Sequence, residues 1–105
     1  MLEISIEKVA QVILYAREIE RAEPEMRGFI DGLNDDEKAS LVAVMWIGRE
    51  AFAADDLEDA KRVAIEEATT PTADYLLGVP HLADNLESGL EALGYSASQA
   101  EEDLL

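Results

Sequence analysis

Apolar residues recur every three or four positions along most of the chain, which is the spacing of one face of an α-helix. In residues 6–22, Ile6 and Ile13 lie on such a face, and the residues between them that point away are mostly polar. Pro24 follows, and a proline cannot donate a backbone hydrogen bond inside a helix. We therefore expect the first helix to stop before Pro24 and a short second helix to cover residues 25–33.

The most apolar segment of the chain is predicted to be a buried central helix over about residues 35–52. Asn34 can accept hydrogen bonds from the first turn of this helix, and Glu37 can reach back to Asn34 to complete a capping box. Beyond the cap, residues 41–48 are apolar on every side of the helical wheel. A helix without a polar face has to be enclosed by other elements.

Three further helices are predicted in the second half of the chain. One begins at Asp55 or Asp56, a short one covers residues 72–77, and one follows Pro80 and places Leu82, Leu86, Leu90 and Leu93 on one face before Gly94 closes it. No repeat or linker interrupts the pattern. We predict an all-α fold with five to six helices around the central helix, as a single domain over residues 1–94, with residues 95–105 as a C-terminal tail or short terminal helix.

The composition narrows the classes of function. The 105 residues carry 24 Asp plus Glu against 8 Lys plus Arg, a formal charge of −16. Such a chain is repelled by phosphate backbones and by anionic lipids, so we expect neither direct nucleic-acid binding nor membrane binding. No apolar run reaches the roughly 18 residues of a membrane helix, and the first residues are acidic where a signal peptide is basic. We expect a cytoplasmic protein.

The charge is distributed unevenly. Every Lys and Arg lies at or before Arg62, whereas residues 63–105 hold nine acids and neither Lys nor Arg. The acids of this C-terminal half can be neutralised only by the N-terminal half or by another molecule. Self-repulsion of this kind should cost stability at low ionic strength.

Arg49 is the most unusual position of the central helix. On the helical wheel it lies on an apolar face between Met45 and Val42, so we expect its guanidinium to be partly enclosed and to need a carboxylate. The candidate carboxylates for an ion pair with Arg49 are three acids of the C-terminal half: Asp74, Asp84 and Glu87. The first interpretation of Arg49 is a structural ion pair, and the second is a residue that binds an anion or a partner.

Three other residues join Arg49 as a candidate partner or ligand surface: Trp46, Tyr75 and His81. Trp46 fits either the core or the rim of a binding surface. His81 forms a His-x-x-Asp-x-x-Glu series, but its members rotate steadily around a helix and do not converge, so we interpret the series as a solvated face. There is no cysteine, and no phosphate loop, nucleophile elbow or catalytic triad spacing. We predict no catalytic residues, no metal site and no cofactor.

Two motifs carry a family resemblance. The Met-Trp-Ile-Gly-Arg motif of residues 45–49 and the Tyr-Leu-Leu-Gly-x-Pro-x-Leu motif of residues 75–82 resemble a family of short proteobacterial helical proteins that is known only as a domain of unknown function. The resemblance extends from about Leu2 to Gly94. It places Trp46, Gly48, Arg49, Tyr75, Gly78, Pro80 and Gly89 on the characteristic positions of the family. It implies a small bacterial protein and no assigned activity.

Several functions remain open at this stage. The leading hypothesis is a small acidic, non-enzymatic interaction or regulatory module whose partner has a basic surface, or which associates with itself. One alternative is a small enzyme or a protein that binds an anionic ligand in a pocket near Trp46, Arg49 and Tyr75. Another is a nucleic-acid mimic. The simplest alternative is that the excess of acidic residues serves only to keep the protein soluble, for example in a cytoplasm with a high salt concentration.

Overall fold

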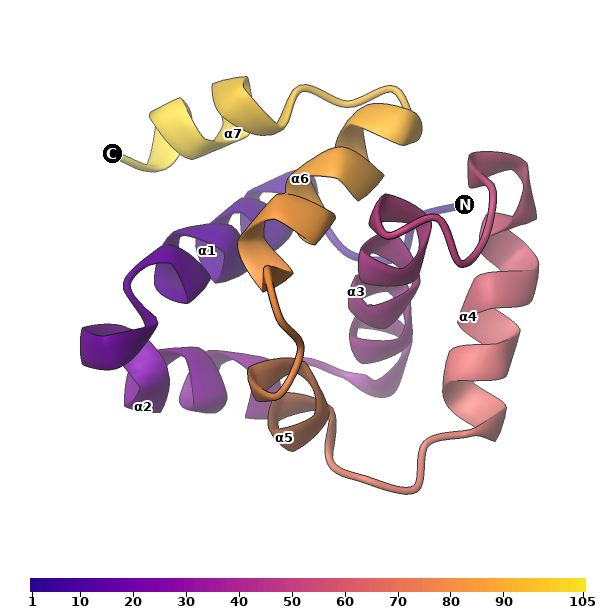
Figure 1. The fold of residues 1–105 in the computed structure, drawn as a ribbon, viewed down its shortest axis with the longest axis horizontal. Coiled ribbons are helices and arrows are strands. Elements are labelled where there is room, and N and C mark those ends of the chain that lie inside the picture. Colours follow the sequence, from indigo (N-terminus) through magenta and orange to yellow (C-terminus); the bar gives the residue numbers. More distant parts are fainter.

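The computed structural model describes residues 1–105 and consists of helices and connecting segments without a β-strand (Figure 1). The elements are α1 (Ile6–Arg17), α2 (Ile19–Asp31), α3 (Asp35–Gly48), a 3-10 turn η1 (Ala54–Asp56), α4 (Leu57–Glu66), α5 (Thr72–Leu77), α6 (Leu82–Ala92) and α7 (Ala97–Leu104). The all-α prediction is confirmed. The chain forms seven α-helices where five to six were expected, because residues 97–104 complete a helix of their own.

Helix α3 is the central element, as its all-round apolar sequence requires. It packs against α6 on one side and α4 on the other, and it also contacts α5 (Figure 1). The capping box is present, since the Asn34 side chain accepts from the Glu37 amide at 2.8 Å and the Glu37 carboxylate accepts from the Asn34 amide at 3.0 Å. All residues from Ala39 to Met45 are buried.

Helix α3 ends earlier than predicted, at Gly48 and not near residue 52. Glu50 adopts a left-handed backbone conformation with φ of 66°. The Glu50 amide donates to the Ile47 carbonyl, and the Ala51 amide donates to the Trp46 carbonyl. These two bonds form a Schellman motif, which usually has glycine at the left-handed position. The wheel pattern alone could not reveal this end because the sequence has Glu there.

The first break in the chain also differs from the prediction. Helix α1 ends at Arg17, and Pro24 lies inside α2. The proline is tolerated because it sits in the second turn, where it removes a single hydrogen bond to an exposed part of the helix. The chain turns at Glu18 instead, because the polar run that follows cannot face the core, and the turn allows Met26 and Ile30 to pack against the buried face of α1.

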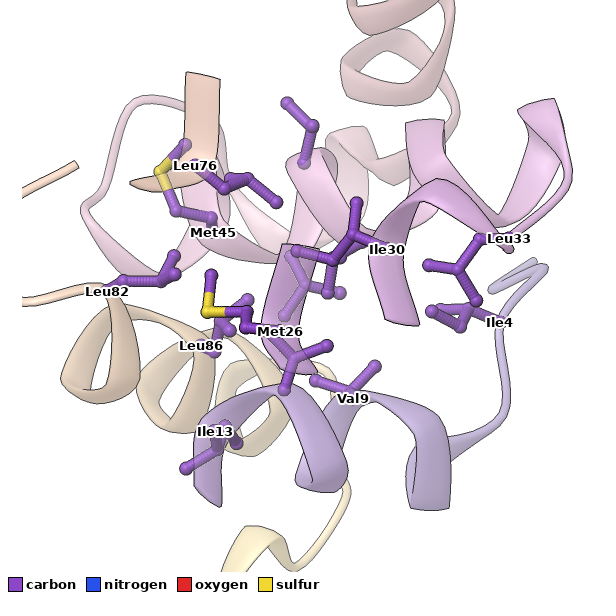
Figure 2. Close-up of a cluster of buried hydrophobic side chains, with 14 of the residues drawn as sticks. Ile4, Val9, Ile13, Met26, Ile30, Leu33, Met45, Leu76, Leu82 and Leu86 are labelled. Atoms are coloured by element: carbon purple, nitrogen blue, oxygen red, sulfur yellow. The ribbon is translucent and has the colours of Figure 1, made fainter. Parts of the chain in front are cut away.

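The core is built from apolar side chains of α1, α2, α3, α5 and α6. Figure 2 shows core side chains converging on one interior, among them Ile13, Met26, Met45 and Leu86, which are completely buried. Helix α3 is buried on all sides through residues 39–45, whereas the other helices each contribute one apolar face, in agreement with the helical spacing of the sequence. The buried set also contains Ile4, which comes from the segment before α1 and packs in the same cluster.

Helices α3 and α6 approach each other so closely that their backbones are in contact at two glycines. A Cβ atom added at Gly48 would lie 1.7 Å from the Asn85 carbonyl oxygen, and one added at Gly89 would lie 2.0 Å from the Val44 carbonyl oxygen. No side chain fits at either position. The crossing therefore depends on glycine in both helices.

Helix α7 lies across the ends of the α1 and α6 layer, remote from α4 (Figure 1). Ser96 caps it by accepting a hydrogen bond from the Gln99 amide at 3.2 Å. Its inward face consists of Ala97, Ala100 and Glu101, all of which are buried. A buried carboxylate on this face needs a partner, which Arg17 of α1 supplies.

Candidate functional site

Two aromatic side chains from different helices meet beside the central helix. The Trp46 indole Nε1 of α3 donates a hydrogen bond to the Tyr75 hydroxyl of α5 at 3.0 Å. The Trp46 ring also stacks on Phe52, which follows α3, with 5.6 Å between the ring centroids. Trp46 and Tyr75 are both half-buried. The structure thus brings together two of the four candidate residues, one on the central helix and one on a short helix 29 residues further along the chain.

This aromatic pair borders a pocket of about 330 Å³ between α3, α4 and α5. The lining consists of Val42, Trp46, Ala64, Glu67, Ala68, Thr69, Thr70, Thr72 and Tyr75. The floor is apolar, and the segment that links α4 to α5 supplies hydroxyl groups. Glu67 is the only charged residue in this lining.

A second hollow of about 250 Å³ continues the pocket along α3 and α4. It shares Val42, Ala64, Ala68 and Thr72 with the first pocket and adds Asp35, Lys38, Ala39 and Ile65. We call the two together the α3–α4 groove. Ile65 is 56% exposed at its edge. The groove therefore presents an apolar floor to solvent, with an aromatic pair and Glu67 at one end and Asp35 and Lys38 at the other.

The prediction that Arg49 is enclosed is wrong. Arg49 is exposed and makes no ion pair in the structure. Because α3 ends at Gly48, Arg49 is its C-cap and does not continue the apolar face that the wheel assigned to it. It also does not line the pocket beside Trp46. Two of its three expected partners are held by other arginines: Asp74 by Arg27 and Glu87 by Arg17.

His81 lies apart from the aromatic pair. It is the exposed N-cap residue of α6, with a left-handed φ of 56°. It borders a separate pocket of about 320 Å³ between the α1–α2 turn and the α5–α6 connection, together with Leu77 and Asp84. Because it precedes the helix, it does not share a helical face with Asp84 and Glu87. No group of three potential metal ligands occurs in the structure.

Three acids in α5, α6 and α7 pair with arginines of α1 and α2. Arg17 of α1 pairs with both Glu87 of α6 and Glu101 of α7, and Arg27 of α2 pairs with Asp74 of α5. Sequence reasoning missed these arginines. Arg17 and Glu101 are separated by 84 positions, and nothing in the local pattern of either segment indicates the other.

The cluster of Arg17, Glu87 and Glu101 holds two carboxyl groups against one guanidinium. Burial and the neighbouring Glu87 raise the pKa of Glu101, while Arg17 acts in the opposite direction. Burial alone would raise the pKa of Glu87, but the contact with Glu101 and the hydrogen bond from Arg17 lower it. One oxygen of Glu101, Oε2, is buried without a hydrogen-bond partner. The two carboxyl groups therefore compete for one cation, and Glu101 holds its proton more tightly than an exposed glutamate does.

Comparison with known proteins shows the family of this chain. Residues 23–95 match a family described as "Protein of unknown function (DUF3775)". The chain belongs to this family. The match agrees with the resemblance carried by the motifs at residues 45–49 and 75–82, and it includes the whole α3–α4 groove.

The family match does not extend to either end of the chain. Helices α1 and α7, which pack against each other, lie outside the matched region. No curated protein and no solved structure matches the chain. None of its helices combines the length and apolar character that crossing a membrane requires.

Proposed function

We propose that this DUF3775 protein is a non-enzymatic docking module that binds a protein partner with a basic surface through the α3–α4 groove. The observation that carries the proposal is the balance of charge after folding. Nine of the 24 acids take part in ion pairs, which leaves fifteen without a cation, whereas only Lys38 and Arg49 among the basic residues lack an acid. Such a surface attracts basic partners and accelerates their association.

The α3–α4 groove is the part of the surface best suited to hold such a partner. Energetic anchors of protein interfaces are commonly aromatic residues beside apolar pockets, with polar groups around them. Trp46 and Tyr75 supply the aromatic groups, and Val42 and Ala64 supply the apolar floor. Phe52 stacks behind Trp46 and their contact restrains the indole ring, so less entropy is lost on binding.

The charge of the pocket favours this reading over an anionic ligand. An anion-binding site near Trp46 needs a cation, and Arg49 was the residue expected to supply it. Arg49 does not line the pocket, and Glu67 does. The field of Glu67 opposes an anion and attracts a cation.

The test uses peptides of equal length that are basic, neutral or acidic, with the same apolar residues in each. Trp46 is the only tryptophan in the chain and lies in the groove, so its fluorescence reports binding there. We expect saturable binding of the basic peptides that weakens as salt rises from about 50 to 300 mM. Equal binding of all three classes, or of none, would refute the proposal.

Two substitutions with the same change in charge locate the binding surface. Ala68→Lys places a cation in the groove, whereas Ala92→Lys places one at the exposed end of α6. We expect Ala68→Lys to weaken binding of the basic peptides about tenfold, and Ala92→Lys to have less than a twofold effect. Equal effects would mean that general attraction, without the groove, accounts for binding. Gel filtration with light scattering measures self-association. If the protein is a dimer and Ala68→Lys dissociates it, the groove binds a second copy of this chain and the proposal of a basic partner is overturned.

A further inference from the structure

We infer that the pocket beside Trp46 binds the charged end of a single lysine or arginine side chain on the partner, with Glu67 as its counter-ion. This inference rests on the proposed function and specifies the chemistry of the same site. It follows from three features of the pocket: its uncompensated negative charge, its aromatic wall and its size.

The negative charge at the pocket comes from the C-terminal end of α4. The last carbonyl groups of a helix carry partial negative charge, and a basic residue in the last turn usually offsets it. Helix α4 has no basic residue there and instead ends with Glu66, followed by Glu67 as the C-cap. Arg62 pairs with Glu66 at 3.1 Å, but no cation pairs with Glu67. The pocket wall therefore lacks a counter-charge within the protein.

The aromatic wall suits a cation as well. An ammonium or guanidinium group beside an indole ring is attracted by the negative face of the ring. The Trp46 indole N–H donates its hydrogen bond to the Tyr75 hydroxyl. Its partial positive charge is therefore satisfied within the protein and does not repel a bound cation. The Tyr75 hydroxyl accepts that bond and keeps its own O–H to donate, which suits a backbone carbonyl of the bound segment. The hydroxyls of Thr69 and Thr70 can accept from the N–H groups of the ligand.

The size of the pocket limits the occupant to one side chain with its flanking backbone. A volume of about 330 Å³ lies at the small end of the range for ligand pockets. The floor of Val42, Ala64 and Ala68 can cover the aliphatic stem of a lysine or arginine, which prefers apolar contact. At the far end of the groove, Lys38 lies in the same hollow as Asp35, so this end has no net charge to attract a second cation. The favoured segment thus has one basic residue, which occupies the pocket beside Trp46.

The experiment compares blocked single amino acids as probes. The N-acetyl amides of arginine and lysine are titrated against their uncharged counterparts, the N-acetyl amides of citrulline and norleucine, and backbone amide shifts of residues 67–75 are followed by NMR. We expect saturable shifts for arginine and lysine only. Equal shifts with citrulline or norleucine would overturn recognition of the cation. If free propylammonium binds as tightly as the basic peptide, the pocket recognises a small free amine, and the inference that a side chain of a protein partner supplies the cation is overturned.

Two neighbouring charge removals provide the matched control. Glu67→Gln is expected to weaken binding of the arginine probe and of the basic peptide about tenfold, whereas Glu66→Gln, with the same change in net charge, is expected to weaken it less than twofold. Both residues are exposed, so both variants should fold. Equal effects of the two variants would overturn the role of Glu67 while leaving the groove as a docking surface. Failure of the basic peptides to bind the unmodified protein would refute the proposed function itself.

Discussion

Substituting Gly48 by alanine tests the contact between α3 and α6 on which the packing of the central helix depends. The added Cβ would lie 1.7 Å from the Asn85 carbonyl oxygen, whereas ordinary contact begins at 3.4 Å. The two helices would have to separate locally by about 1.7 Å, the difference between these distances. The obstacle is backbone, which cannot rotate away as a side chain can.

The cost can be set against the gain in helix propensity. Overpacking a core costs about 1–3 kcal/mol, and the value here belongs at the upper end because backbone atoms must move. Alanine is favoured over glycine within a helix by about 1 kcal/mol. The net loss for Gly48→Ala is therefore about 2 kcal/mol, which lowers the Tm of a domain of this size by roughly 10 °C.

The assay is urea denaturation followed by circular dichroism, together with thermal melting. Gly28→Ala is the matched control, because Gly28 lies in α2, is exposed, and has no atom within 4 Å of an added Cβ. It should stabilise the protein by about 0.5–1 kcal/mol. The difference between the two variants isolates the steric cost, about 3 kcal/mol. If Gly48→Ala were as stable as wild type, the close crossing of the helices would be refuted.

Three further predictions follow from features of the fold. Glu50→Gly should relieve the left-handed strain at φ of 66° and stabilise the protein by up to about 1 kcal/mol in urea denaturation, whereas Glu50→Ala should not. Because the pKa of Glu101 is raised, the stability that its carboxyl contributes is present below its unfolded-state pKa and is lost as the pH rises through its folded-state value. Glu101→Gln, which resembles the protonated acid, should therefore gain stability relative to Glu102→Gln, an exposed control, when unfolding is measured from about pH 4 to pH 7; parallel pH profiles would contradict this. Tyr75→Phe removes the acceptor of the Trp46 N–H and should cost about 1 kcal/mol by chemical denaturation; an unchanged midpoint would show that water replaces the hydroxyl.

Features that depend on neighbouring residues could be predicted from the sequence. The cap formed by Asn34 and Glu37 and the enclosed helix after it follow from spacing within one segment, and both occur in the structure. The closing residue of α6 is equally local, since Gly94 has a left-handed φ of 93°. The predicted helix break at Pro24 is wrong, because a proline in the second turn of a helix costs little stability. The actual break, at Glu18, is set by which apolar residues can reach the core.

Features that depend on tertiary contacts could not be predicted. The exposure of Arg49 depends on where α3 ends, and Glu50 takes a backbone conformation for which its residue type gives no signal. The ion pair between Arg17 and Glu101 joins the two ends of the chain. The meeting of Trp46 with Tyr75 depends on how α5 is placed against α3. Glu67, the charged residue of the pocket, could have been noticed only as an acid at an uncompensated helix end.

Helix α4 has a consequence for the dynamics of the protein. Among the helices it packs chiefly against α3, with its other contacts at η1, and the N-terminal segment holds it from outside through Lys61, which is bonded to Glu3 at 2.8 Å. An element attached on so few sides should open as a unit at a lower free energy than global unfolding. Amides of α4 should therefore exchange with solvent hydrogen faster than those of α3. Since α4 forms one wall of the groove, the width of the groove can change while the rest of the fold stays intact.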